Sequence, residues 1–263
     1  MLNPWAVLFF LLTVAVVLSI VEPRDRRWRH LFLMLLVVVP FNMCLAFALL
    51  KMVGSAGYRY DEYFYEIDRC LGSPSWWVAR LLNSLPWLKA VARFDYECSI
   101  VISIFAMTAC TILRGPGRGW RFLGACVSVG GFIPPFYRFI PASGPAYAFK
   151  GFPYALPTFS HAQAIVLHAA PNCMPSAHFA LALLVAVSLR EWKLGRWLGA
   201  LHVILTTAST LGLGEHYAID LISAVPYTAI IVTAFGLVRR PVESGASALP
   251  VPVPAAAASL PSA

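Results

Sequence analysis

Seven stretches of the chain are apolar and close enough to 20 residues long to be interpreted as membrane-spanning helices. An α-helix rises about 1.5 Å per residue, so roughly 20 apolar residues cross the hydrocarbon of a bilayer. The stretches cover residues 5–21, 31–50, 98–113, 120–140, 175–189, 197–213 and 218–238. This pattern predicts an all-α fold, a polytopic membrane bundle of six to seven transmembrane helices.

The basic residues between these stretches alternate from loop to loop. They gather after the first, third, fifth and seventh stretches: Arg24, Arg26, Arg27, Arg29, Arg114, Arg118, Arg121, Arg190, Lys193, Arg196, Arg239 and Arg240. Loops rich in Lys and Arg stay in the cytoplasm. We therefore expect the N-terminus outside, the C-terminus inside, and the segments 51–96 and 141–174 on the extracytoplasmic face.

The hydrophobic pattern predicts one transmembrane domain over residues 1–239 and a Pro/Ala/Ser-rich, disordered cytoplasmic tail over 240–263. Residues 75–93 interleave Trp with Arg and Lys in a helical rhythm broken at Pro86. That favours an interfacial helix in the headgroup layer over a short helix that covers the bundle. The outer loop 141–174 is expected to form a packed cap with a short helix around 160–169.

Composition supports a membrane protein. Of the 263 residues 59% are hydrophobic and only 12% charged, with a mean hydropathy of +0.72, whereas soluble domains have about 25% charged residues. We expect an integral protein of the cell's inner or plasma membrane. The net charge of +8 is attributed to membrane topology and not to nucleic acid. The six cysteines show no C-x-x-C spacing, so no metal or redox motif is predicted.

Two polar clusters interrupt the apolar pattern, at residues 172–178 and 214–220. Polar side chains at membrane depth are costly and mark functional sites. His216 and Asp220 are four apart and would share a helix face. The carboxylate could then hold the ring Nδ1–H and leave Nε2 free as a base or nucleophile. Both clusters fall at the outer ends of predicted helices.

The first cluster has the composition of an anion site at a helix start. Pro175 is predicted as the first helical residue, where its missing N–H costs nothing. Ser176, Ala177 and the free N–H groups there could bind phosphate, and His178 could act as a general acid. Taken singly, such residues could instead cap a helix or tie two helices together. Their spacing and their common membrane face favour catalysis.

The combined motifs resemble those of the type 2 phosphatidic acid phosphatase superfamily. Its P-S-x-H motif is matched by Pro175, Ser176 and His178. Its S-R-x5-H-x3-D motif is matched by Ser209, His216 and Asp220, with Thr210 in place of the arginine. The resemblance extends in outline over residues 61–237.

The residue sequences at 174–178 and 215–217 look most like those of the inositol phosphorylceramide synthase branch, and so does the Pro-Ala-Ser-Gly-Pro motif at 141–145. The K-x6-R-P motif of the phosphatases is not visible. This branch implies transfer of a phospho-headgroup to a hydroxyl acceptor, either a lipid or a headgroup alcohol. The alternatives are a lipid phosphate phosphatase acting on phosphatidate or a polyprenyl phosphate, and a non-enzymatic protein that binds or transports lipid.

The resemblance also implies a mechanism without cofactor or metal. His216 would form a phosphohistidine, Asp220 would orient it, and His178 would protonate the leaving oxygen. The substrate would be a membrane lipid that reaches the site at the outer leaflet. No nucleic-acid partner is expected, and the oligomeric state is not predicted.

Further candidates follow from what the site still needs. A phosphoryl group in transfer requires positive charge, and Arg138 and Lys150 are the basic residues nearest the motifs, although they could instead anchor lipid phosphates. Tyr137, Tyr147 and Tyr217 are candidate donors to the substrate. Other histidines carry weaker signals: His161 and His168 could join His178 and His216 in a metal site but are more simply loop residues, and His202 is interpreted as a packed polar residue.

Overall fold

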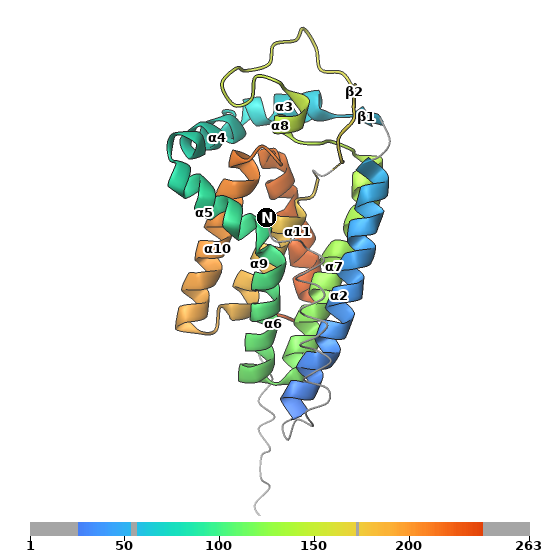
Figure 1. Ribbon diagram of the computed structural model, residues 1–263, viewed down its shortest axis with the longest axis vertical. Coiled ribbons are helices and arrows are strands. Elements are labelled where there is room, and N and C mark those ends of the chain that lie inside the picture. The colour runs from blue at the N-terminus through green and yellow to red at the C-terminus, as the bar shows by residue number, and fades with distance from the viewer. Residues whose placement is uncertain (1–25, 54–56, 172–173, 239–263) are drawn as a thin grey trace, which may run out of the picture.

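The computed structural model describes residues 26–53, 57–171 and 174–238, which form a predominantly helical chain (Figure 1). The helices are α2 (Arg26–Val53), α3 (Asp61–Cys70), α4 (Pro74–Ser84), α5 (Pro86–Glu97), α6 (Ser99–Arg114), α7 (Pro116–Phe139), α8 (Pro145–Ala148), α9 (Ala177–Leu189), α10 (Lys193–Gly212) and α11 (Ala218–Ala234). Two short strands, β1 (Gly57–Arg59) and β2 (Ile165–Leu167), pair antiparallel. The predicted all-α class is confirmed.

Six of the seven predicted apolar stretches coincide with helices α2, α6, α7, α9, α10 and α11. The first stretch, 5–21, and the predicted tail lie outside the described residues. Within the described ranges, one helix is long and apolar enough to cross a membrane unaided, over Arg27–Ala48. A second qualifies if α5 and α6, bent by 60° at their junction, form one span. The predicted number of spans therefore remains a prediction.

Proline sets the starts of four helices, α8 at Pro145 being the shortest. Pro74, Pro86 and Pro116 each occupy the first turn of α4, α5 and α7, where a missing N–H costs no hydrogen bond. The expected break at Pro86 is confirmed, because α4 ends at Ser84 and α5 starts at Pro86. The breaks at Pro74 and Pro86 divide the segment after β1 into the short helices α3, α4 and α5 near one end of the bundle (Figure 1).

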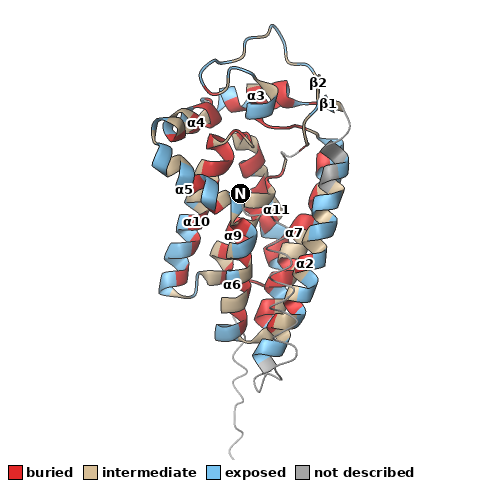
Figure 2. Cartoon of the chain, in the orientation of Figure 1, coloured by how far each residue is buried: buried red, intermediate tan, exposed pale blue. Residues whose placement is uncertain are grey.

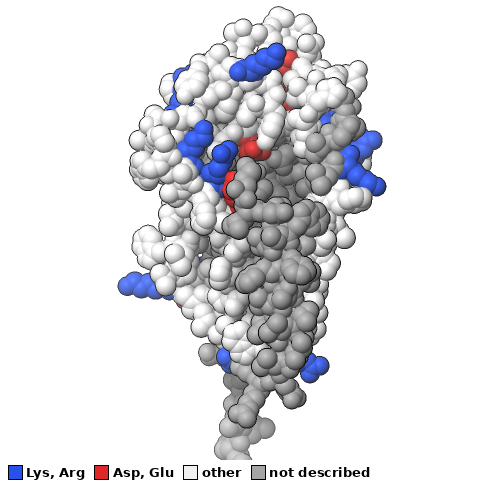
Figure 3. Space-filling view, viewed as in Figure 1, with Lys and Arg blue, Asp and Glu red and all other residues white. Residues whose placement is uncertain are grey.

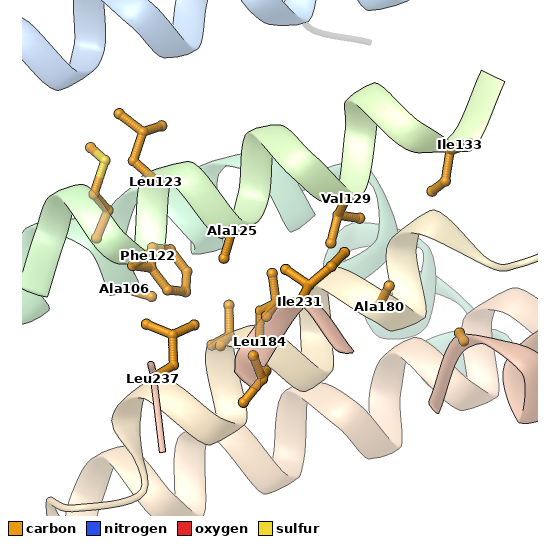
Figure 4. Packing of buried hydrophobic residues seen from close by; sticks show 14 of the residues in the cluster. Ala106, Phe122, Leu123, Ala125, Val129, Ile133, Ala180, Leu184, Ile231 and Leu237 are labelled. Carbon is orange, nitrogen blue, oxygen red and sulfur yellow. The ribbon is translucent and has the colours of Figure 1, made fainter. Parts of the chain in front are cut away.

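The main core lies between α2, α6, α7, α9 and α11. Its buried side chains are mostly aliphatic and small: Met34, Ala106, Met107, Phe122, Leu123, Ala125, Val129, Ile133, Tyr137, Ala180, Leu184, Val185, Ala224, Ile231, Val232 and Leu237. Figure 4 shows Phe122, Ala125 and Val129 of α7 facing Leu184 and Ile231. Close packing of this kind holds helices together even where lipid provides no hydrophobic driving force.

The outward faces of the bundle are also apolar. Large side chains with more than half their surface exposed occur on α2, α6, α7, α10 and α11, among them Phe47, Phe105, Phe132, Ile204 and Ile230. Figure 2 shows exposed residues along the outer sides of α2 and α10. Apolar surface of this extent on a water-soluble monomer would be unusual.

A cap covers one end of the bundle. It is built from α3, α4 and the loop between α7 and α9, and β1 pairs with β2 across it (Figure 1). A second cluster of buried residues, containing Phe64, Tyr65, Trp76 and Tyr217, fills the space beneath. The packed cap predicted for 141–174 is confirmed in its described residues, but the helix predicted around 160–169 is wrong. Ile165–Leu167 is extended because β1 supplies its hydrogen-bond partners.

Charged side chains gather toward the two ends of the molecule (Figure 3). At the end opposite the cap, Arg114 Nη2 lies 2.6 Å from Glu191 Oε2. Arg118 Nη2 donates to the Leu237 carbonyl at 2.6 Å. These arginines belong to the loops predicted as cytoplasmic, so the cap and the basic loops occupy opposite ends of the bundle.

Candidate active site

The two polar motifs meet beneath the cap. The Ser176 N–H donates to the Asp220 carbonyl at 3.1 Å, which joins the start of α9 to the first turn of α11. From the end of α7, the Tyr137 hydroxyl donates to the Pro175 carbonyl at 3.4 Å. Residues 137, 176 and 220 come from three helices, yet all lie at the same end of the bundle. The expectation that the motifs share one end is confirmed.

His216 and Asp220 form a fully buried pair, with Nδ1 3.3 Å from Oδ2. The expected contact is present, but the reason differs from the prediction. His216 precedes α11, and Asp220 sits in the first helical turn, where its Oδ2 also accepts the Tyr217 N–H at 2.8 Å. The carboxylate thus caps the helix and holds the histidine at once. The prediction that both residues lie within one helix is wrong.

Ser176 is the N-cap of α9, and its hydroxyl oxygen accepts the Phe179 N–H at 3.4 Å. Pro175 therefore precedes the cap, and the prediction that it is the first helical residue is wrong. The helix begins two residues later, at Ala177, because the Ser176 hydroxyl can accept a free backbone N–H, whereas the proline side chain has no acceptor. The backbone N–H groups of the first turn of α9, which include those of Ala177 and His178, point out of the N-terminal end of the helix, as in other α-helices.

Three polar atoms of the motif residues are buried without a hydrogen-bond partner in the described part of the chain. They are His216 Nε2, His178 Nδ1 and Asp220 Oδ1. A buried polar atom that makes no hydrogen bond costs about 1–3 kcal/mol, so such atoms gathered between two motifs indicate a place for a polar ligand. Within the same described residues, no group of three His, Cys, Asp or Glu side chains could hold a metal ion.

Helix α3 supplies two buried carboxylates that the sequence analysis missed. Asp61 accepts the N–H groups of Ser143 and Gly144, at 3.0 and 2.9 Å, and the Tyr217 hydroxyl at 2.9 Å. Asp68 accepts the Ala218 N–H at 3.0 Å. Both therefore grip the residues that directly follow His216. Their spacing of seven residues places them on one helix face, and this could have indicated a shared role. The sequence does not indicate which residues they bind.

Burial controls the charge of these two carboxyls. It raises the pKa of Asp61 to about 6, although its three donors oppose the shift. Burial likewise raises the pKa of Asp68, against the hydrogen bonds from Ala218 and Ser75. Desolvation disfavours the charged form of a carboxyl. The loop between α10 and α11, residues 213–217, is called the His216 loop. It is thus held by two carboxyl groups that resist ionisation.

The loop that resembles the branch's first motif packs against the His216 loop. Gly144 has φ +99°, and a β-carbon built there would lie 2.5 Å from the Glu215 carbonyl oxygen. The Tyr147 hydroxyl donates to Glu215 Oε1 at 2.8 Å. Tyr147 is half exposed, whereas Tyr137 and Tyr217 are buried. All three predicted tyrosines therefore bind protein groups next to the motifs.

The predicted cations lie farther out. Arg138, in the last turn of α7, and Lys150, in the turn after α8, are both exposed. Thr210, which replaces the arginine of the family motif, is buried, and its hydroxyl donates to the Thr206 carbonyl at 2.7 Å. Its own carbonyl accepts the His216 N–H at 3.1 Å. His161 and His168 are also exposed.

An apolar cavity of about 250 Å³ reaches the site. It lies between α2, α6, α7 and α9, and neither Asp, Glu, Lys nor Arg occurs among its lining residues. His178 and Tyr137 line it as well. The ring of Tyr96 stacks on His178 with a centroid distance of 3.9 Å and an angle of 23°. No feature of the sequence indicated that Tyr96 would reach His178.

Comparison with known proteins gives one result. A protein-family model described as the PAP2 superfamily matches residues 62–234. No curated protein and no solved structure matches the chain. The match includes both polar motifs and α3 from its second residue onward.

Proposed function

Because the chain belongs to the PAP2 superfamily, we propose that it is a membrane enzyme that cleaves or transfers a phosphate ester of a lipid through a phosphohistidine on His216. The observation that carries the proposal is the buried pair of His216 and Asp220, which leaves Nε2 without a partner among the described residues. A carboxylate on Nδ1 directs the lone pair of Nε2 outward, as a nucleophile requires.

The reaction has two steps. His216 Nε2 attacks phosphorus while the bond to the ester oxygen breaks, and that oxygen takes a proton from His178. Water or an alcohol then attacks the phosphohistidine, gives its proton to His178, and releases His216 as a neutral ring. Asp220 stabilises the ring cation between the steps. Ser176 and the N–H groups of the first turn of α9 hold the phosphoryl oxygens.

A lipid substrate is supported by the apolar cavity beside His178. A hydrocarbon chain gains roughly 0.8 kcal/mol for each buried methylene, so the cavity favours a ligand with a tail. The two reacting histidines lie at the polar end of the helices. A lipid could therefore keep its tail between α2, α6 and α7 while its phosphate reaches His216.

Membrane location is supported by the helix over Arg27–Ala48 and by the exposed apolar faces. The basic loops lie at the end away from the site. With those loops in the cytoplasm, the site belongs on the extracytoplasmic face. The phosphate of an outer-leaflet lipid would then lie at the depth of His216.

Trapping the intermediate tests the mechanism. Purified protein is mixed with phosphatidate carrying ³²P, stopped in base, and mapped by mass spectrometry. We expect label on His216 that is stable in base and lost in acid, and none in His216→Ala. The variant His178→Ala should accumulate less label because the leaving oxygen lacks its acid. Label on another residue, or an active His216→Ala protein, would overturn the proposal.

The acceptor needs its own experiment. Labelled phospholipid is supplied with and without ceramide or diacylglycerol as a hydroxyl acceptor. Labelled product lipid that forms only with the acceptor indicates transfer, which the resemblance to the inositol phosphorylceramide synthase branch implies. Free phosphate or phosphoalcohol released at the same rate in both samples indicates hydrolysis.

A further inference from the structure

A second buried histidine–aspartate pair lies outside the two motifs. His202 of α10 and Asp95 of α5 are 4% and 6% exposed, with Nδ1 2.7 Å from Oδ1. The Thr206 hydroxyl donates to the other carboxylate oxygen at 2.9 Å. Both oxygens of Asp95 are thus engaged. His202 Nε2 is buried without a partner in the described ranges.

If this position served only to pack α5 against α10, a buried histidine–aspartate pair would be an energetically costly choice. Desolvating a histidine and a carboxylate consumes much of what their attraction returns, and apolar side chains of similar volume often stabilise as well or better. The pair joins two helices, α5 and α10, that also pack against each other through other residues. A functional role therefore explains it better than stability does.

The end of α5 connects this pair to the active site. Tyr96 directly follows Asp95, and its ring stacks on His178 at 3.9 Å between centroids. The α5 helix ends at Glu97 and the chain bends by 60° into α6. Without an anchor at Asp95, the last turn of α5 could shift at this bend and move Tyr96 off the histidine ring.

We propose that Asp95, His202 and Thr206 are positioning residues for the general acid: they anchor the end of α5 so that Tyr96 holds the His178 ring at the leaving oxygen. The inference rests on the proposed function, since it assumes that His178 protonates the leaving group. Displacement of an acid by about 1 Å lowers its rate contribution about a hundredfold, so the anchor matters even though it touches no substrate.

The test compares two phosphate monoesters with the same hydrocarbon tail, dodecyl phosphate and 4-dodecyl-2-nitrophenyl phosphate. The first leaves as an alkoxide and needs a proton, whereas the second leaves as a stabilised phenolate and needs little help. The rate of phosphoenzyme formation is measured in a single turnover for each. We expect Asp95→Asn and His202→Gln to lose about tenfold to a hundredfold with dodecyl phosphate. With the nitrophenyl ester they should stay within about threefold of wild type.

Matched variants separate positioning from folding. Thr206→Val removes the hydroxyl that binds Asp95, whereas Thr207→Val removes one that donates to the Val203 carbonyl of its own helix. We expect the leaving-group effect in Thr206→Val and not in Thr207→Val. Tyr96→Leu should reproduce it because the stacked ring is lost, and Tyr96→Phe should restore most of the dodecyl phosphate rate.

Each outcome decides the inference. Equal losses with both esters would mean that the pair merely supports the fold, and the inference would be wrong. The same holds if Thr206→Val and Thr207→Val are indistinguishable. If wild type labels His216 and His178→Ala shows the leaving-group effect, but the Asp95 and His202 variants do not, the proposed function stands and only the anchor fails. A wild type that forms no phosphoenzyme with either ester overturns both.

Discussion

The carboxylate of Asp220 has two tasks, and one substitution can separate them. It accepts the Tyr217 N–H as a helix cap and contacts His216 Nδ1. In Asp220→Asn the amide oxygen can still accept the Tyr217 N–H, but the neutral side chain cannot stabilise a ring cation.

We expect Asp220→Asn to lower kcat at least about a hundredfold, while the free energy of unfolding changes by less than about 1 kcal/mol. Steady-state kinetics and thermal unfolding of the detergent-solubilised protein measure the two effects. A large loss of stability, or unchanged kcat, would contradict the assignment of Asp220 as the orienting group.

Gly144 tests whether the loop after α7 shapes the His216 loop. Its φ of +99° disfavours any side chain, and a β-carbon would collide with the Glu215 carbonyl at 2.5 Å. We expect Gly144→Ala to destabilise by roughly 1–3 kcal/mol and to lower activity further, because the clash pushes on the residue before His216.

Gly72 provides a matched control for this substitution. It also has a positive φ, +87°, but a β-carbon there meets nothing within 4 Å. Gly72→Ala should therefore show the backbone strain without the collision, and kcat should remain near wild type. Equal loss of kcat in the two variants would separate the 143–145 loop from the chemistry. Phosphoenzyme formation and thermal unfolding are the measurements.

At the scale of elements, α3 is the helix of the cap that connects the loops around the site. Asp61 binds both the 143–144 amides and the Tyr217 hydroxyl, so it joins two loops that are far apart in sequence. Asp68 adds the Ala218 amide. Because these two carboxyls connect the loops on both sides of the site, the stability of the fold can depend on whether they are ionised.

The raised pKa of Asp61, about 6 against an ordinary 3.8, predicts how stability depends on pH. Between these values the folded protein holds a proton that the unfolded chain has released. Stability from this group is therefore present below about pH 4, falls as pH rises toward 6, and stays low above it. A shift of about two units corresponds to about 3 kcal/mol.

Asp61→Asn should remove this pH dependence. We expect its free energy of unfolding, relative to wild type, to rise by about 3 kcal/mol between pH 4 and pH 7. Asp68→Asn should move in the same direction, since burial raises the pKa of that carboxyl too. Thermal unfolding as a function of pH measures the difference. Parallel curves for Asp61→Asn and wild type would show that Asp61 titrates in the folded protein as it does in the unfolded chain.

At the scale of the molecule, the sequence predicted those features that depend on local pattern. Six apolar stretches became helices because their length and hydropathy leave little choice. The meeting of residues 176 and 220 followed from alternating basic loops, a rule about whole helices. Pro86 broke a helix because the constraint of proline acts at its own position.

The features that were missed depend on contacts between distant residues. Asp61 finds Ser143 and Tyr217 across 82 and 156 positions, and Asp95 finds His202 across 107. Single-sequence patterns hold no information on such partners. The same reason explains why Ile165–Leu167 is a strand, since its partner is Gly57–Arg59. The start of α9 was misplaced because one hydrogen bond to the Ser176 hydroxyl decides it, whereas the start predicted at residue 218 agrees with that of α11.

The outward faces raise a question that exposure alone cannot answer, namely whether they meet water or lipid. Ile204 on α10 is 63% exposed, and Tyr154 in the cap loop is 72% exposed. In water, a charge at either place would change stability by less than about 0.5 kcal/mol. In a bilayer, an arginine at the middle of a helix costs about 2.5–3.5 kcal/mol or more, while one in the cap remains in water.

We therefore expect Ile204→Arg to reduce membrane integration and thermal stability in nanodiscs, and Tyr154→Arg to leave both unchanged. Resistance to alkaline carbonate extraction after expression measures integration, and unfolding in nanodiscs measures stability. If the two variants behave alike, the face of α10 meets water or protein and not hydrocarbon.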